Sequence, residues 1–184
     1  ALDPLEVLVD AHATDAHAVG YLVPKPAPSR GYEEAIPRLT TRALGSLIRA
    51  GVEPVVAWVF VDVDNAGHAK WTDAEATASV RAIFERSPNT LLRSAAWYTT
   101  GGGFRLLWRL VDPVRATEYR SWSTGFLEAL SRQTGIPLVG PAERDAAKVA
   151  GREAPGGIDT TCVQWSRCYR LPRVVRDGRP TTPG

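Results

Sequence analysis

Two aspartates, Asp62 and Asp64, stand at the end of an apolar run that begins at Val55. Side chains alternate between the two faces of a strand, so a strand here places both carboxylates on the same face. Neighbouring carboxylates repel each other and are costly to bury, and a bound divalent cation removes that cost. The alternative is a solvated strand end that leads into a turn at Asn65. The pair is therefore a candidate metal site.

A glycine-rich stretch supplies the second candidate for chemistry. Thr100, Gly101, Gly102 and Gly103 are followed closely by Arg105. Glycines let the backbone approach a ligand and expose N–H groups, while a guanidinium matches the geometry of phosphate oxygens. We expect this turn to bind the phosphates of a nucleotide. The alternative is an ordinary hairpin turn with Arg105 in solvent.

Positive charge is concentrated in the C-terminal part of the chain. The net charge is +2, but residues 1–102 carry more Asp and Glu than Lys and Arg, whereas residues 103–184 show the reverse. Arginines recur there at every third position, at Arg167, Arg170, Arg173, Arg176 and Arg179. We expect some of them, Arg170 first, to contact phosphates of a template or nucleotide. The alternative is a strand edge protected by charge.

The composition of the chain argues against a membrane-spanning protein and against a protein with a structural zinc site. No apolar run reaches the length of a membrane span, and no signal peptide opens the chain. The two cysteines, Cys162 and Cys168, do not form a CxxC pair, so we expect no structural zinc site and a reducing, cytoplasmic compartment. The chain lacks methionine even at position 1, and we expect it to be a piece of a longer protein.

The elements that must position these residues follow from periodicity and from helix and turn signals. We predict helices over residues 39–50, 72–87, 112–134 and 142–149, strands over 55–64, 91–99, 104–111 and from 158 onward, and a hairpin at Asp177-Gly178. From residue 55 the order is strand, helix, strand, strand, helix, strand. This order is typical of the split βαβ unit, so the predicted fold class is α+β with an RNA-recognition-motif-like (RRM-like) core. Its first and third strands are neighbours, which brings the aspartates close to the glycine-rich turn.

Three motifs in this order resemble a known family. They are Asp62-x-Asp64, then Gly103-Phe104-Arg105 in the hairpin, then Asp159 ahead of Arg170-Leu171-Pro172. Together they resemble the archaeo-eukaryotic primase superfamily, in its primase-polymerase branch, which is found in phage and plasmid replication proteins. Two positions depart from the family pattern. Arg105 stands where the family has histidine, and Arg173 where it often has glycine.

The resemblance implies an enzyme, a DNA primase/polymerase that makes short primers from nucleoside triphosphates on single-stranded DNA. It implies Asp62, Asp64 and Asp159 as catalytic ligands of two Mg²⁺ or Mn²⁺ ions. It also implies nucleotide binding by Thr100, Gly101, Gly102, Gly103, Arg105 and Arg170. We expect one catalytic domain over 1–184, with an annex over 1–54 and the core over 55–176. A helicase domain elsewhere in the same full-length chain, and the cytoplasm of a bacterial host, would fit. The alternatives are a non-catalytic RRM-like module that binds single strands and a metal-dependent nuclease.

Overall fold

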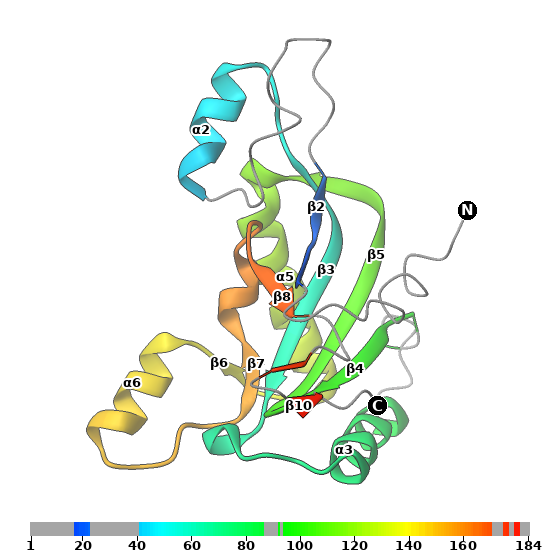
Figure 1. Ribbon diagram of the computed structural model, residues 1–184, viewed down its shortest axis with the longest axis vertical. Helices are drawn as coiled ribbons and strands as arrows, with labels where there is room; N and C mark the ends of the chain where they lie inside the picture. The colour runs from blue at the N-terminus through cyan, green and yellow to red at the C-terminus, as the bar shows by residue number, and fades with distance from the viewer. Residues whose placement is uncertain are drawn as a thin grey trace.

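The protein has a mixed α+β fold in which a mostly antiparallel sheet is covered by helices (Figure 1). The structure is a computed structural model, and it describes residues 17–22, 41–86, 92, 94–170, 175–176 and 179–180. The turn expected at Asp177-Gly178 and the motif position Arg173 lie outside these residues. Of the helices in the described ranges, none is both long enough and apolar enough to cross a bilayer.

The main sheet is organised around β3, which pairs with β2, β5 and β7. Its strands run in the order β4-β5-β3-β7-β6, and β2 also pairs with β3. They are β2 (Tyr21–Leu22), β3 (Val55–Asp64), β4 (Ala96–Thr100), β5 (Gly103–Arg115), β6 (Leu138–Val139) and β7 (Gly157–Asp159). All of the pairings are antiparallel except the one between β6 and β7. The predicted contact between the strand that carries Asp62 and the strand that follows the glycine-rich turn is confirmed.

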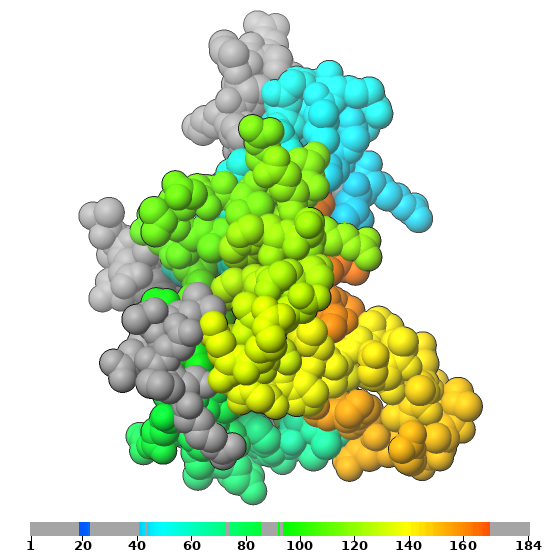
Figure 2. Space-filling model, turned by 180° about the vertical axis from the view of Figure 1, so that it is seen from behind, coloured from blue at the N-terminus to red at the C-terminus, as the bar shows by residue number. Residues whose placement is uncertain are grey.

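Smaller elements complete the described chain. Two short ladders pair β1 (His17–Val19) with β8 (Cys168–Arg170), and β9 (Val175–Arg176) with β10 (Arg179–Pro180). The helices are α2 (Thr41–Arg49), α3 (Asp73–Arg86), α5 (Ala116–Thr134) and α6 (Pro141–Val149), and the 3₁₀ turns are η1 (Ala66–His68) and η2 (Thr160–Val163). The back view in Figure 2 shows α5 across the middle of the molecule.

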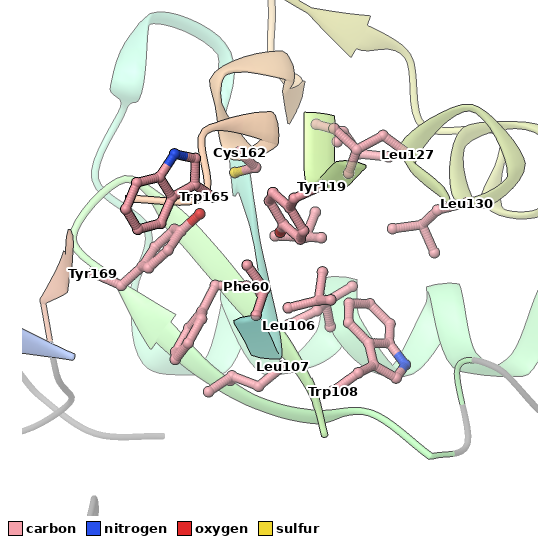
Figure 3. Packing of buried hydrophobic residues seen from close by; sticks show 14 of the residues in the cluster. Phe60, Leu106, Leu107, Trp108, Tyr119, Leu127, Leu130, Cys162, Trp165 and Tyr169 are labelled. Carbon is pink, nitrogen blue, oxygen red and sulfur yellow. The ribbon is translucent and has the colours of Figure 1, made fainter. Parts of the chain in front are cut away.

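The core explains why β3 is apolar almost throughout. Val59, Phe60 and Val61 are each at most 2% exposed although they alternate between the faces of the sheet. Both faces of this strand are therefore covered, which favours a continuous apolar run over an alternating one. On one side Phe60 stacks on Tyr169, with ring centroids 4.5 Å apart (Figure 3). Tyr119 of α5 belongs to the same buried cluster.

Helix boundary signals in the sequence agree with the structure at several places. Thr72 and Glu75 form the expected capping box, because the Thr72 N–H donates to Glu75 Oε2 at 2.8 Å and the Glu75 N–H donates to Thr72 Oγ1 at 3.3 Å. Gly51 and Gly135 follow α2 and α5 with φ of 75° and 72°, a backbone conformation that glycine tolerates at helix ends.

The sequence prediction is wrong around Asp112 and Pro113. They were expected to begin a helix, but β5 continues to Arg115 and α5 begins at Ala116. The β3–β5 register shifts here, since Val56 pairs with Val114 but Trp58 with Arg109, so residues 110–113 form a bulge. Within a bulge Pro113 needs no ladder hydrogen bond, which is why a proline is tolerated inside this strand. The preceding strand is also shorter than predicted, because β4 begins at Ala96 rather than at residue 91.

Candidate active site

The sheet register brings the three predicted carboxylates together. Asp62 and Asp64 lie on β3, and β7 pairs with the same end of that strand through Val63 and Ile158. Continuing that antiparallel register places Asp159 beside Asp62 on the same face. Asp62 and Asp159 are buried, at 6% and 3% exposure, and the Asp64 side chain is 21% exposed. The carboxylates therefore converge from two neighbouring strands, an arrangement that the family resemblance implies.

The glycine-rich turn meets the aspartates at the same end of the sheet. Gly103 pairs with Asp64, and the Asn65 N–H donates to the Gly102 carbonyl at 2.7 Å. A side chain at Gly103 would overlap the carbonyl oxygen of Val63, so this position requires glycine for close strand contact. Gly101 faces open space, and Thr100 pairs with Gly103 across the turn. The described turn thus borders the carboxylates.

Arg105 lies opposite Asp62 in the β3–β5 register and is only 9% exposed. Its Nε donates to Asp62 Oδ1, and its Nη1 donates to the Tyr98 hydroxyl at 2.6 Å. The guanidinium carbon also lies 5.4 Å from the ring centroid of Tyr98 and 5.1 Å from that of Tyr169. Burial lowers the pKa of this guanidinium, but the charges and hydrogen bonds of Asp62 and Tyr98 together outweigh that effect and hold the pKa above its ordinary value. The charge of Arg105 therefore compensates the charge of Asp62, and its contact with a nucleotide stays a prediction.

Two further arginines bridge the carboxylates in pairs. Arg144 of α6 donates to Asp64 Oδ2 at 2.9 Å and to Asp159 Oδ1 at 3.2 Å. Arg167, between η2 and β8, donates to Asp62 Oδ2 at 3.0 Å and to Asp159 Oδ2 at 2.7 Å. Nothing in the sequence around Arg144 marks it as a partner of residues 80 and 15 positions away. The sequence indicates Arg167 only as one of a series of arginines that we expect to contact phosphates.

The carboxylates differ in their electrostatic surroundings. Burial raises the pKa of the Asp64 carboxyl, and the neighbouring Asp62 charge raises it further. Burial would also raise the pKa of Asp159, but hydrogen bonds from the Thr161 hydroxyl and N–H hold that pKa below its ordinary value. Asp159 is thus the more firmly ionised of the two.

Cys162 is a neighbour that the sequence did not indicate as part of the site. The 3₁₀ turn η2 follows Asp159 directly and brings the Cys162 sulfur to 3.3 Å from the Asp62 N–H, which donates to it. Ligand atoms of Asp62, Asp159 and Cys162 all lie within 4.8 Å of one another, so this buried group can bind a metal ion. Burial raises the pKa of the Cys162 thiol to about 11. Because a protonated thiol is a poor ligand, the carboxylate oxygens are the better donors, and hard divalent cations fit them.

The remaining predicted residue, Arg170, lies in a two-stranded ladder that is separate from the main sheet. Its backbone belongs to β8 and pairs with His17 of β1. The structure therefore brings together Asp62, Asp64, Asp159, the glycine-rich turn and Arg105, while the assignment of Arg170 to a nucleotide stays a prediction. Cys162, Arg144 and Arg167 add to the site that the sequence predicted.

Comparison with known proteins supports a polymerase-like fold. No protein-family model matches the sequence, and a search of curated proteins finds no match. Among solved structures, the chain is similar to the polymerase domain from Mycobacterium tuberculosis Ligase D in complex with DNA, with a TM-score of 0.51 and 13% sequence identity. The match covers 92% of this chain and 51% of that one, so this chain spans about half the length of its structural neighbour. At this identity the likeness shows the fold, and that fold carries here a buried group of side chains able to bind a metal.

Proposed function

We propose that the protein is a DNA primase/polymerase, which joins nucleoside triphosphates into short primers on a single-stranded DNA template. The observation that carries the proposal is the convergence of Asp62, Asp64 and Asp159 beside the glycine-rich turn. Paired carboxylates beside a phosphate-binding turn are what two-metal nucleotidyl transfer requires. Similarity to a polymerase domain solved with DNA supports the same reaction class and a DNA partner.

The residues have distinct roles in this proposal. Asp62, Asp64 and Asp159 hold Mg²⁺ or Mn²⁺, for which carboxylate oxygens are suitable ligands. When bound, such ions supply activation of a 3′ hydroxyl and stabilisation of charge on the triphosphate. The backbone N–H groups of the turn from Thr100 to Gly103 orient phosphates. Arg105 holds the Asp62 carboxylate in place, because its guanidinium is fixed against that carboxylate and Tyr98.

The domain organisation of this proposal is an RRM-like core with additions. The strand order β4-β5-β3-β7 supports it, since a split βαβ unit places its first and third strands side by side at the centre. The core would run over residues 55–176 and the annex over 1–54, in one catalytic domain.

One observation favours a second candidate function. Each of the three carboxylates is already paired with an arginine, so the charges of this site are balanced without a metal. A non-catalytic module that binds single-stranded nucleic acid would have no use for a metal. Its binding would weaken with salt and would not depend on divalent cations.

A primer-synthesis assay on single-stranded DNA separates these functions. Ribonucleotides and deoxyribonucleotides are supplied separately with Mn²⁺ or Mg²⁺, and the products are resolved by length. We expect metal-dependent synthesis that is lost in Asp62→Asn and in Asp64→Asn. Asp112→Asn, an exposed aspartate in the β5 bulge, is the matched control and should retain synthesis.

The outcomes point to different functions. Undiminished synthesis by the double variant at Asp62 and Asp64 would overturn the proposal. DNA binding with no synthesis and no metal requirement would favour the non-catalytic module. Metal-dependent cleavage of DNA without added nucleotides would instead indicate a nuclease on the same core.

A further inference from the structure

Guanidinium groups cover the oxygens that a metal would use. They contact both oxygens of Asp62, both oxygens of Asp159 and Oδ2 of Asp64. The other oxygen of Asp64 lies 3.7 Å from His68 Nδ1. A cation that coordinates these oxygens must replace some of those contacts, because two positive charges cannot share one oxygen at short range without strong repulsion. Metal binding and arginine binding at this site are therefore in competition.

The three arginines differ in how firmly they are held. The Arg105 side chain is 10% exposed, is hydrogen-bonded to Tyr98 and lies against two aromatic rings. The side chains of Arg144 and Arg167 are 23% and 24% exposed, although Arg167 also donates to Thr161 Oγ1 and its guanidinium carbon lies 5.4 Å from the ring centroid of Tyr169. Their charged groups are therefore closer to solvent than that of Arg105, and they can turn toward solvent more easily. Arg105 is the fixed counter-ion, and the other two are the displaceable ones.

The positions of Arg144 and Arg167 fit this difference. Arg144 lies in the first turn of α6, a short helix at the side of the sheet (Figure 1). Arg167 lies in the loop after η2, where its N–H donates to the Gln164 carbonyl at 3.1 Å. Each guanidinium bridges two different carboxylates, and ligand atoms of the pair that Arg167 bridges, Asp62 and Asp159, lie within 4.8 Å of each other. The arginines thus preserve the shape of the site before a metal binds.

We propose that Arg144 and Arg167 are exchangeable counter-ions that release the carboxylates when a divalent cation binds and then bind the triphosphate of the nucleotide. This inference rests on the proposed function. A guanidinium binds phosphate through the same two-pronged N–H geometry that it uses for carboxylate, so the released side chains suit the triphosphate oxygens. Metal and triphosphate then bind with positive coupling, since each favours the state in which the arginines have left the carboxylates.

Opposite effects on two ligands distinguish this role from a purely structural one. In the absence of nucleotide, Arg144→Gln and Arg167→Gln should each bind Mn²⁺ more tightly than the wild type, by about tenfold, because a competing cation is gone. With Mn²⁺ saturating, the same variants should bind a non-hydrolysable nucleoside triphosphate about tenfold more weakly. If the arginine only supported the fold, its replacement would weaken the binding of both ligands or of neither.

Mn²⁺ binding is measured from the electron paramagnetic resonance signal of the free ion, and triphosphate binding by calorimetry. Arg120→Gln, which removes an exposed arginine of α5, is the matched control and should change neither affinity. Arg144→Lys retains the charge but loses the two-pronged geometry, and it should fall between the wild type and Arg144→Gln. This conservative variant keeps the test valid if Arg144→Gln fails to fold.

The inference and the proposed function fail in different ways. If neither the wild type nor the arginine variants bind Mn²⁺, the inference and the proposed function are both overturned. If the wild type binds Mn²⁺ and the arginine variants bind it no more tightly, the inference alone is overturned. Tighter Mn²⁺ binding together with weaker triphosphate binding supports it.

Discussion

Replacing Arg105 with leucine tests whether this buried guanidinium compensates the charge of Asp62. The change leaves a carboxylate that is 6% exposed without its closest partner, and it removes the donor to the Tyr98 hydroxyl. Breaking a buried ion pair by removing one partner costs about 3–5 kcal/mol. Arg167 still contacts Asp62, and a leucine at position 105 keeps part of the packing of this side chain against the Tyr98 and Tyr169 rings. We therefore expect a loss near the lower end, about 3 kcal/mol of unfolding free energy.

Urea unfolding followed by circular dichroism measures this loss. Arg109→Leu is the matched control, because Arg109 lies on the same strand with an exposed side chain, and it should change stability by less than about 0.5 kcal/mol. A double-mutant cycle that combines Arg105→Leu with Asp62→Asn measures the interaction energy between the two side chains. Neutralising Asp62 removes the charge that Arg105 compensates, so Arg105→Leu should cost less in the Asp62→Asn background.

Two results would refute this reasoning. A loss below about 1 kcal/mol would mean that Asp62 does not depend on Arg105. Additive losses in the cycle would mean that the two side chains do not interact energetically, whatever their distance.

Three other substitutions test the fold around the site. Hydrogen bonds from the Thr72 backbone and hydroxyl lower the pKa of Glu75, so the charged form adds stability above the ordinary pKa of 4.5 that is lost as pH falls through the lowered folded value. The melting temperature of the wild type should exceed that of Glu75→Gln at pH 7, and the gap should narrow as the pH falls below 4.5; a constant gap would contradict the assignment. Gly103→Ala should lower the free energy of unfolding by about 1–3 kcal/mol, because the added methyl overlaps the backbone of β3, and an unchanged urea midpoint would contradict that contact. Leu130→Ala should lower the free energy of unfolding in urea by about 2–5 kcal/mol, since Leu130 is fully buried in α5. Val111→Ala, at a side chain that is 96% exposed, should change it almost not at all. Similar losses for the two variants would place Leu130 outside the core.

The sequence was sufficient to predict an element of the fold where the local signal and the tertiary structure agree. The apolar run from Val55 predicted a strand with both faces buried, and the capping box at Thr72 marked the start of α3. The place of Asp159 beside Asp62 was implied only by the resemblance to the primase superfamily, and the pairing of β7 with β3 brings the two residues together. The strand and the helix start form as predicted because no long-range contact opposes the local signal.

Features set by long-range contacts were not predictable. Asp112-Pro113 is a strong helix-start signal, yet pairing with β3 keeps these residues in a strand by means of a bulge. The bridges made by Arg144 and Arg167 depend on where α6 and the loop after η2 are placed, which periodicity does not reveal. Cys162 joins the site because the chain tightens into a 3₁₀ turn immediately after Asp159.

The most direct test of a metal-dependent active site is anomalous diffraction from crystals of the protein grown with Mn²⁺ and a non-hydrolysable nucleoside triphosphate. We predict an anomalous peak within about 2.5 Å of oxygens of Asp62, Asp64 and Asp159, with Arg144 and Arg167 turned away from them. Crystals that contain Mn²⁺ elsewhere, but retain both arginine bridges and show no peak at the three carboxylates, would contradict the account.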